Sequence, residues 1–257
     1  MRKPPTAFVN VLGVRIDAST LEDATSRIGE WIATGERTYV CVCSVNNVVE
    51  ARRSVEYRRV LNRSSLNTPD GMPLVWQLHR HGLAWATRVY GPDLLVSVCK
   101  AATGTGWRHF FYGGRDGVAA SLAAHMGDRF QGLRIAGVLS PPVASVDELS
   151  SDEAAAQINS SGADIVWVGL STPKQEQWMA RMRERLVAPV LIGVGAAFDF
   201  HTHRIPQAPP WMQARGLEWL FRLVSEPRRL WRRYLIGNSW FLWNLAFQEL
   251  GLKRFPL

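Results

Sequence analysis

The chain has 257 residues, of which 47% are hydrophobic and 20% are charged, and its formal net charge at pH 7 is +8. This length and composition are enough to bury a full core as one α/β domain with an appendage. The three cysteines form no Cys-x-x-Cys pair, and the longest nearly uncharged apolar run, residues 187–198, is too short to cross a bilayer. We therefore expect buried thiols rather than a disulfide framework, in a protein that is soluble or peripheral to a membrane.

The positive charge is concentrated near the carboxyl end of the chain. Residues 1–203 contain 21 Lys+Arg and 19 Asp+Glu, which gives +2, whereas residues 204–257 contain 9 and 3, which gives +6. This asymmetry predicts an anionic partner, such as a phosphate, a nucleic acid or lipid headgroups.

Segments of strand and helix character alternate through most of the chain. A short hairpin or an edge strand is predicted at residues 8–16, around Gly13. The later strands are predicted at 38–45, 64–68, 108–112, 133–139, 165–168 and 190–194. Helices are predicted between them. One starts after Ser19 or Thr20, one ends at Ala102 and one starts near Pro173, and the others are predicted at 48–61, 74–78, 118–130 and 145–160. The alternation predicts an α/β fold, a three-layer sandwich whose mainly parallel sheet has about six strands.

Prolines and then a basic, tryptophan-rich segment end this alternation. We therefore divide the chain into an α/β core, residues 1–203, and a helical appendage, residues 204–257, in which two helices carry Trp, Phe and Leu between arginines. Trp219 and Leu220 are expected to pack on the core, whereas residues 240–247 are expected to lie in a membrane interface. The alternative is a helical cap whose aromatic face packs on the sheet while its arginines are solvated.

Polar residues follow several predicted strands. Ligands of α/β sheets bind at the carboxyl ends of the strands, so we expect these residues to share one rim. Asp70 is one of them, and its carboxylate is either a general base or a cap for the next helix. Lys174, Gln175, Glu176 and Asp199 are expected at the same rim, although the first three also suit an ordinary helix start.

Gly113 and Gly114 stand between a strand and a helix, where backbone N–H groups approach a phosphate or sugar closely. The pattern is not the dinucleotide fingerprint, and the sequence contains neither a GxxxxGK[ST] loop nor an Asp-x-Asp pair. Asp199, His201 and His203 alternate along the chain and would share one face of a strand, as metal ligands do. No second ligand cluster accompanies them, so a metal-dependent hydrolase remains only an alternative.

Several motifs recur in a characteristic order: TPDGMPLVW, RVYGPDLL, FFYGG, VGLSTPKQEQW, IGVGAAFD and APPWMQARGLEWLFRLVSEPRRLWRRYL. From about Phe8 to Leu235 the chain resembles the WecG/TagA/CpsF family of bacterial glycosyltransferases. The resemblance implies inverting transfer of a sugar from a UDP-sugar to a polyprenyl-diphosphate-linked saccharide, at the cytoplasmic face of the membrane. It also implies a Rossmann-like core with a carboxyl-terminal appendage that completes the active site.

Position by position, the resemblance implies that Asp70 is the catalytic base. The matching pocket residues are Ser44, Asn46, Arg88, Gln175 and Asp199, and the matching appendage arginines are Arg222, Arg229 and Arg232. Ser44 stands where the family usually has threonine, and residues 201–203 stand where it often has a shorter, glycine-containing turn. These departures concern the identity of the sugar rather than the reaction class.

The chemistry agrees with this resemblance. Inverting transfer needs one base for the acceptor hydroxyl, and Asp70 supplies it. Because no Asp-x-Asp pair is present to hold a bridging metal, we expect the appendage arginines to stabilise the UDP leaving group without a metal or another cofactor. The basic appendage is expected to bind the anionic membrane surface of the bacterial inner membrane, where a lipid-linked acceptor resides.

A nucleic-acid-binding α/β protein is the second alternative, suggested by the arginine run and the basic charge. It predicts salt-sensitive binding to generic DNA or RNA, and it explains neither Asp70 nor the PKQE motif. The hydrolase alternative predicts metal in the purified protein. We rank both below the transferase and expect no nucleic-acid partner.

Overall fold

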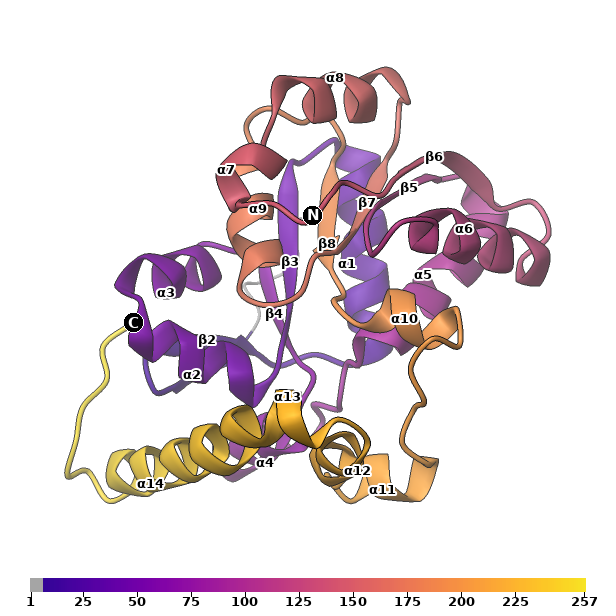
Figure 1. Ribbon diagram of the computed structural model, residues 1–257. Helices are drawn as coiled ribbons and strands as arrows, with labels where there is room; N and C mark the ends of the chain where they lie inside the picture. The colour runs from indigo at the N-terminus through magenta and orange to yellow at the C-terminus, as the bar shows by residue number, and fades with distance from the viewer. Residues whose placement is uncertain (1–6) are drawn as a thin grey trace.

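The computed structural model describes residues 7–257, and its centre is a sheet of six strands in which every neighbouring pair is parallel (Figure 1). The strands are β3 (Thr38–Cys43), β4 (Leu66–Pro69), β5 (Arg108–Gly113), β6 (Arg134–Leu139), β7 (Ile165–Gly169) and β8 (Val190–Gly193). They lie side by side in the order β4-β3-β8-β7-β5-β6. The predicted α/β fold with about six parallel strands is confirmed.

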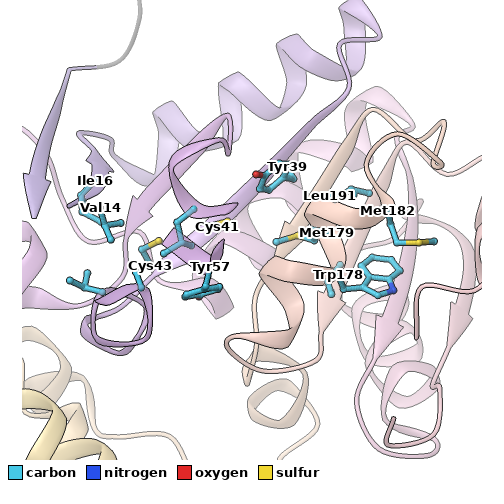
Figure 2. Packing of buried hydrophobic residues seen from close by; sticks show 14 of the residues in the cluster. Val14, Ile16, Tyr39, Cys41, Cys43, Tyr57, Trp178, Met179, Met182 and Leu191 are labelled. Carbon is cyan, nitrogen blue, oxygen red and sulfur yellow. The ribbon is translucent and has the colours of Figure 1, made fainter. Parts of the chain in front are cut away.

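Helices cover both faces of the sheet, because consecutive strand residues point to opposite sides. In β3, Tyr39 and Cys41 enter one core, whereas Val40 and Val42 enter the other. The first core is covered by α2 (Val45–Arg53), α3 (Val55–Asn62), α7 (Val146–Leu149), α8 (Asp152–Ser160) and α9 (Lys174–Met182). The second is covered by α1 (Leu21–Thr34), α5 (Gly91–Thr105), α6 (Val118–Arg129) and α10 (Ala197–His201). Figure 2 shows side chains of the first core, with Cys41 of β3 and Met179 of α9 among them.

Two of the predicted helices are each divided in two. Residues 48–61 belong to α2 and α3, because the side chain of Ser54 accepts a backbone N–H of the following turn and begins a new helix. Residues 145–160 form α7 and α8 for the same reason, with Ser151 as the cap. The first helix starts as predicted, since Thr20 forms a capping box at its N-terminus.

An antiparallel hairpin, β1 (Phe8–Val11) and β2 (Val14–Asp17), forms around Gly13, which is the first of the two predicted alternatives. The carboxylate of Asp17 accepts the backbone N–H of Asn67 at 2.7 Å, which fixes the hairpin to β4. The remaining helix of the core, α4 (Met72–Arg80), follows β4 and contacts β1.

The tail contains more helices than the two that were predicted. They are α11 (Pro210–Ala214), α12 (Glu218–Ser225), α13 (Pro227–Trp231), the π-helical segment η1 (Arg232–Gly237) and α14 (Asn238–Glu249). The last three follow one another directly and form the long yellow helix of Figure 1. The break before them occurs at Glu226, which has an extended φ of −135°, and Pro227 then starts the long helix.

One side of the long helix packs on the core. Leu230, Tyr234, Phe241 and Leu245 are spaced four or seven residues apart and are buried, and the last two join the core that contains α2 and the hairpin. Beyond α14, the buried Phe255 joins the same core, and its carbonyl accepts a hydrogen bond from the Asn10 side chain at 2.7 Å. The two ends of the described chain therefore pack together.

The expected division of the tail aromatics holds only in part. Trp219 is half-buried near the ring of Tyr234, but Leu220 is exposed, although both were expected to pack on the core. Within the segment expected at a membrane, Trp240 is half-buried against the core and Trp243 is 67% exposed. Residues 7–257 include no helix that combines the length and the apolar character needed to cross a membrane.

Arg183, at the end of α9, ties this helix to the start of the strands. Its guanidinium is buried and donates to the carbonyls of Thr38 (2.8 Å), Leu186 (2.7 Å), Ala188 (2.6 Å) and Pro189 (3.2 Å). One side chain thus satisfies four carbonyls in the loop before β8 and at the first residue of β3.

Arg183→Met should lower the free energy of unfolding by about 2–4 kcal/mol, because buried carbonyls lose their donors. Urea denaturation measures this change. The matched control is Arg181→Met on the same helix, whose exposed ion pair with Asp147 is expected to contribute less than about 1 kcal/mol. Equal effects of the two substitutions would contradict the role given to Arg183.

Candidate active site

A cavity of about 800 Å³ lies at the carboxyl edge of the sheet, a size typical of small-molecule sites. Parallel strands all end at this edge, so the segment after each of the six strands contributes to the wall, with Ser44, Asp70, Gly114, Ser140, Ser171 and Gly195. The tail supplies further charged residues of the wall, namely Glu218, Arg222, Glu226, Arg229 and Arg233.

Asp70 lies directly after β4, and its N–H donates to the carbonyl of Cys43 at 2.8 Å. The N-cap of α4 is Gly71, without a side-chain bond, so Asp70 does not cap this helix. Its carboxylate lines the cavity, and 22% of the side chain is exposed. Burial raises the pKa of Asp70 to about 6; Arg88 opposes this rise and the carboxylate of Glu218 adds to it.

Arg88 joins the core to the tail beside Asp70. Its Nη2 donates to Asp70 Oδ1 at 3.2 Å and to Glu218 Oε2 at 2.6 Å, and its Nε donates to the backbone carbonyl of Asp70. Its guanidinium lies 4.0 Å from the centre of the Tyr90 ring, and the Tyr90 hydroxyl donates to Glu218 Oε1 at 3.2 Å. Arg88 itself is outside the cavity wall, so it contacts the site through Asp70 and Glu218.

A buried polar cluster supports the wall on the α9 side. Glu176 is fully buried, and its Oε1 accepts from Asn47 Nδ2 (2.9 Å), the Thr172 hydroxyl (3.0 Å) and Gln175 Nε2 (2.9 Å). Gln175 Oε1 in turn accepts the N–H of Gly195 at 2.9 Å. Glu176 Oε2 has no partner among the described residues, and burial raises the pKa of this carboxyl. The cluster joins α2, α9 and the turn after β8.

The predicted pocket residues divide into two groups. Ser44, Gly114, Gln175 and Asp199 line the cavity, whereas Asn46 and Gly113 do not. Asn47 lines it instead of Asn46, because adjacent helix positions point about 100° apart. The hydroxyl of Ser44 donates to Asn47 Oδ1 at 2.9 Å and holds that side chain at the wall.

Gly113 allows close packing of two strands rather than contact with a ligand. Its φ is +117°, and a Cβ there would lie 2.7 Å from the carbonyl oxygen of Gly169. The N–H of Gly114 donates to the same carbonyl at 2.9 Å, so it is not free for a phosphate. This differs from the expectation that both glycines offer N–H groups to a ligand.

The three appendage arginines predicted for the site do not share one face. Arg222 and Arg229 line the cavity, but Arg232 is exposed next to the ring of Trp231, at 5.2 Å. Arg222 lies before the break of the helix at Glu226, and Arg229 and Arg232 lie after it. The wall position that was expected for Arg232 belongs to its neighbour.

That neighbour, Arg233, is one of two cavity arginines with a buried Nε atom that has no partner in the described part of the chain. The Nε atoms of Arg222 and Arg233 are buried and have no hydrogen-bond partner among residues 7–257. Burial lowers the pKa of Arg233, as expected for a cation without a full set of anionic partners. Arg229, by contrast, pairs with Glu226 through two bonds of 2.6 Å. The wall therefore holds unsatisfied cationic donors suited to an anionic ligand.

The alternating Asp199, His201 and His203 lie in or just after α10 rather than on a strand. Positions two apart in a helix point in different directions, so the expected common face does not exist. His201 Nε2 contacts the carbonyl of Pro92 at 3.0 Å, and the ring of His203 lies 6.0 Å from that of His125. No metal-ligand cluster of three His, Cys, Asp or Glu occurs within the described part of the chain. The prediction that Asp199, His201 and His203 share one face, on which the hydrolase alternative depended, was therefore wrong.

Comparison with known proteins agrees with the motifs. The model of the glycosyl transferase WecG/TagA/CpsF family matches residues 9–255. The chain belongs to this family. Among its relatives is an N-acetylglucosaminyldiphosphoundecaprenol N-acetyl-beta-D-mannosaminyltransferase of Bacillus spizizenii, 32% identical over 186 residues, 72% of this chain and 70% of the relative. A protein of the same name from Bacillus subtilis strain 168 is 29% identical over 202 residues, 78% and 75% of the two chains.

Several wall residues of this family member were not predicted from the sequence, among them Glu218, Asn47 and Arg233. Glu218 stands in the EWLFRL motif beside Arg222, and its charge alone was a usable signal. Asn47 and Arg233 are each adjacent to a residue that was predicted, and only the direction of the helix separates the two neighbours.

Glu176→Ala should lower the free energy of unfolding by about 2–4 kcal/mol, since three buried donors lose their acceptor. Glu176→Gln should stay within about 1 kcal/mol of wild type at neutral pH, because an amide oxygen replaces Oε1 and no charge is buried. Because the pKa of Glu176 is raised in the folded protein, the free energy of unfolding of wild type relative to Glu176→Gln is highest at acidic pH. It decreases as the pH rises above the ordinary pKa of 4.5.

Urea denaturation at acidic and neutral pH tests both statements. Glu50→Ala, which removes a surface carboxylate of α2 paired with Arg53, is the matched control and should change the free energy by less than about 1 kcal/mol. Equal destabilisation by the alanine and glutamine substitutions at Glu176 would contradict the role of Glu176 Oε1 as the acceptor for these donors.

Proposed function

We propose that this protein transfers a sugar from a UDP-sugar to a polyprenyl-diphosphate-linked saccharide with inversion at the anomeric carbon. The observation that carries the proposal is the Asp70 carboxylate directly after β4, whose pKa is raised to about 6, in one cavity with two arginines whose buried Nε donors have no partner among residues 7–257. Membership of a glycosyltransferase family supports it. The names of both relatives suggest N-acetylmannosamine as the sugar and N-acetylglucosaminyl-diphosphoundecaprenol as the acceptor.

In the proposed reaction, Asp70 takes the proton of the acceptor hydroxyl. The acceptor oxygen attacks the anomeric carbon from the face opposite UDP, the bond from that carbon to the diphosphate oxygen breaks, and UDP leaves with the electron pair. Displacement from the opposite face inverts the configuration. A base whose pKa is about 6 is ionised at neutral pH and retains more basicity than an exposed aspartate.

The negative charge that develops on UDP needs stabilisation, and we assign this to the cavity arginines. Arg222 and Arg233 have buried Nε atoms without partners, and Arg229 stands with them in the wall. Arginine donors form strong charge-assisted bonds to diphosphate oxygens. We therefore propose catalysis without a metal or other cofactor.

For the other predicted site residues, we base the proposed role on whether the residue lines the cavity. Ser44, Gly114, Gln175 and Asp199 are proposed to contact the sugar or nucleotide, because they line the cavity. Asn46, Gly113 and Arg88 are proposed to act indirectly, since they do not line the cavity.

We further propose that residues 204–257 attach the α/β core, residues 1–203, to the cytoplasmic face of the bacterial inner membrane. The long helix is apolar on two sides: one side packs on the core, and the other exposes Trp231, Leu235, Ile236, Leu242 and Trp243. Water is an unfavourable environment for such an outer side, whereas a membrane interface accommodates it. The exposed Arg228 and Arg232 would meet anionic headgroups.

Asp70→Asn should fold normally and lose about 100- to 10,000-fold in turnover, because the base is removed. The assay follows release of UDP from UDP-sugars in the presence of a short-chain polyprenyl-diphosphate saccharide and EDTA. Asp128→Asn, which changes an exposed carboxylate of α6 outside the cavity wall, is the matched control and should keep near-wild-type turnover. Active Asp70→Asn protein, or activity that appears only when a divalent ion replaces EDTA, would count against the proposal.

Two adjacent arginines are expected to have different roles, Arg233 in catalysis and Arg232 in membrane binding. Arg233→Ala should lower turnover on a soluble acceptor by about 10-fold or more, since a leaving-group cation is lost. Arg232→Ala should leave that turnover nearly intact and weaken sedimentation with anionic vesicles at low salt, more so when combined with Trp243→Ser. Val187→Ser, which replaces an exposed apolar residue far from the tail, is the control for vesicle binding. A reversed pattern for the two arginines would refute this division of roles.

A further inference from the structure

The Arg88 guanidinium is shared unequally between two carboxylates of the cavity wall. A single nitrogen, Nη2, lies 2.6 Å from Glu218 Oε2 and 3.2 Å from Asp70 Oδ1. The shorter bond is therefore made to the tail and the longer one to the proposed base. Both carboxylates are largely enclosed, with 16% and 22% of their side chains exposed, so solvent screens this competition weakly.

The remaining contacts hold Glu218 in this arrangement. Its second oxygen accepts the Tyr90 hydroxyl at 3.2 Å, and the Tyr90 ring lies against the Arg88 guanidinium at 4.0 Å from its centre. Gln207 donates to the Tyr90 hydroxyl at 3.2 Å. Glu218 is thus oriented from both sides, and its position is fixed relative to Arg88.

An arginine paired fully with an aspartate makes that carboxylate a poor base, because the ion pair favours its charged form. A second carboxylate that draws the same arginine away has the opposite effect. We propose that Glu218, contributed by the tail, is a positioning residue that holds Arg88 away from full pairing with Asp70 and so keeps the Asp70 carboxylate ready to accept the acceptor's proton. This inference rests on the proposed role of Asp70 as the base.

Other charged and titratable groups also face Asp70. Arg222 of α12 and Arg233 of η1 are cations, and Tyr90 and Cys43 are weak acids of the core. Arg222 and Arg233 favour the ionised form of Asp70, as Arg88 does. Glu218 is the carboxylate that raises the pKa of Asp70, and Asp93 of α5 is a further carboxylate that faces Arg88 and Glu218. Without Glu218, burial still raises the pKa of Asp70, but the arginines that lower it are no longer opposed by this carboxylate.

The test is the pH dependence of kcat/KM, measured with the full-length protein on a soluble acceptor. The base works when deprotonated, so the rate falls as pH drops through the pKa of Asp70, about 6 in wild type. Glu218→Gln keeps the size of the side chain and an acceptor for Arg88 but removes the charge. Its acid limb should move to lower pH by about one unit, and its plateau should fall several-fold because the base is weaker.

Three further variants define the outcome. Glu218→Asp keeps the charge, so its acid limb should lie close to that of wild type. Glu218→Ala takes the place of Glu218→Gln if the glutamine protein does not fold, and its acid limb should also move to lower pH by about one unit. Glu249→Gln breaks another ion pair between tail and core, with Arg80 at 2.7 Å, and should leave the profile unchanged.

An acid limb that stays in place in folded Glu218→Gln and Glu218→Ala, or that moves equally in Glu249→Gln, would overturn the inference. If Asp70→Asn abolishes turnover in the same assay, that failure concerns Glu218 alone. If Asp70→Asn remains active, the proposed function itself fails.

Discussion

All six strands of the sheet run in one direction, and the rest of the molecule follows from this constraint. Each parallel connection must cross a face of the sheet, so both faces are covered by helices and the strands are apolar on consecutive positions. The carboxyl ends meet at one edge, where the loops bring together residues far apart in the chain. At Gly113 the sheet accepts only glycine, because the carbonyl of Gly169 occupies the place of a side chain.

Some of the charged groups at the cavity form ion pairs, whereas two of its arginines keep a buried donor without a partner in the described part of the chain. Asp70 is paired with Arg88, and Glu226 with Arg229. Arg222 and Arg233 keep buried donors without partners among the described residues. Buried donors without a partner are uncommon in folded proteins, and the two at the cavity wall are placed where an anionic ligand would satisfy them.

The tail connects this chemistry to the surface of the molecule. Its long helix places Arg233 in the cavity wall, while the next residue toward the N-terminus, Arg232, lies outside beside Trp231. The helix packs on the core through Phe241 and Leu245, so its orientation is fixed by the same core that supports the sheet. A membrane bound to the outer side would therefore lie at a defined position relative to the cavity.

The sequence by itself determined the α/β class, the number of parallel strands and the family, because apolar runs, turn residues and motifs are local properties of the chain. It also placed Asp70, Gln175 and Asp199 at one rim, since residues after parallel strands must meet there. The direction of individual side chains was decided only by the tertiary structure. Asn47 replaces Asn46 and Arg233 replaces Arg232 because one residue along a helix turns a side chain by about 100°. The pairing of Arg88 with both Asp70 and Glu218 likewise depends on how the tail folds back over the core, a long-range contact that no local pattern encodes.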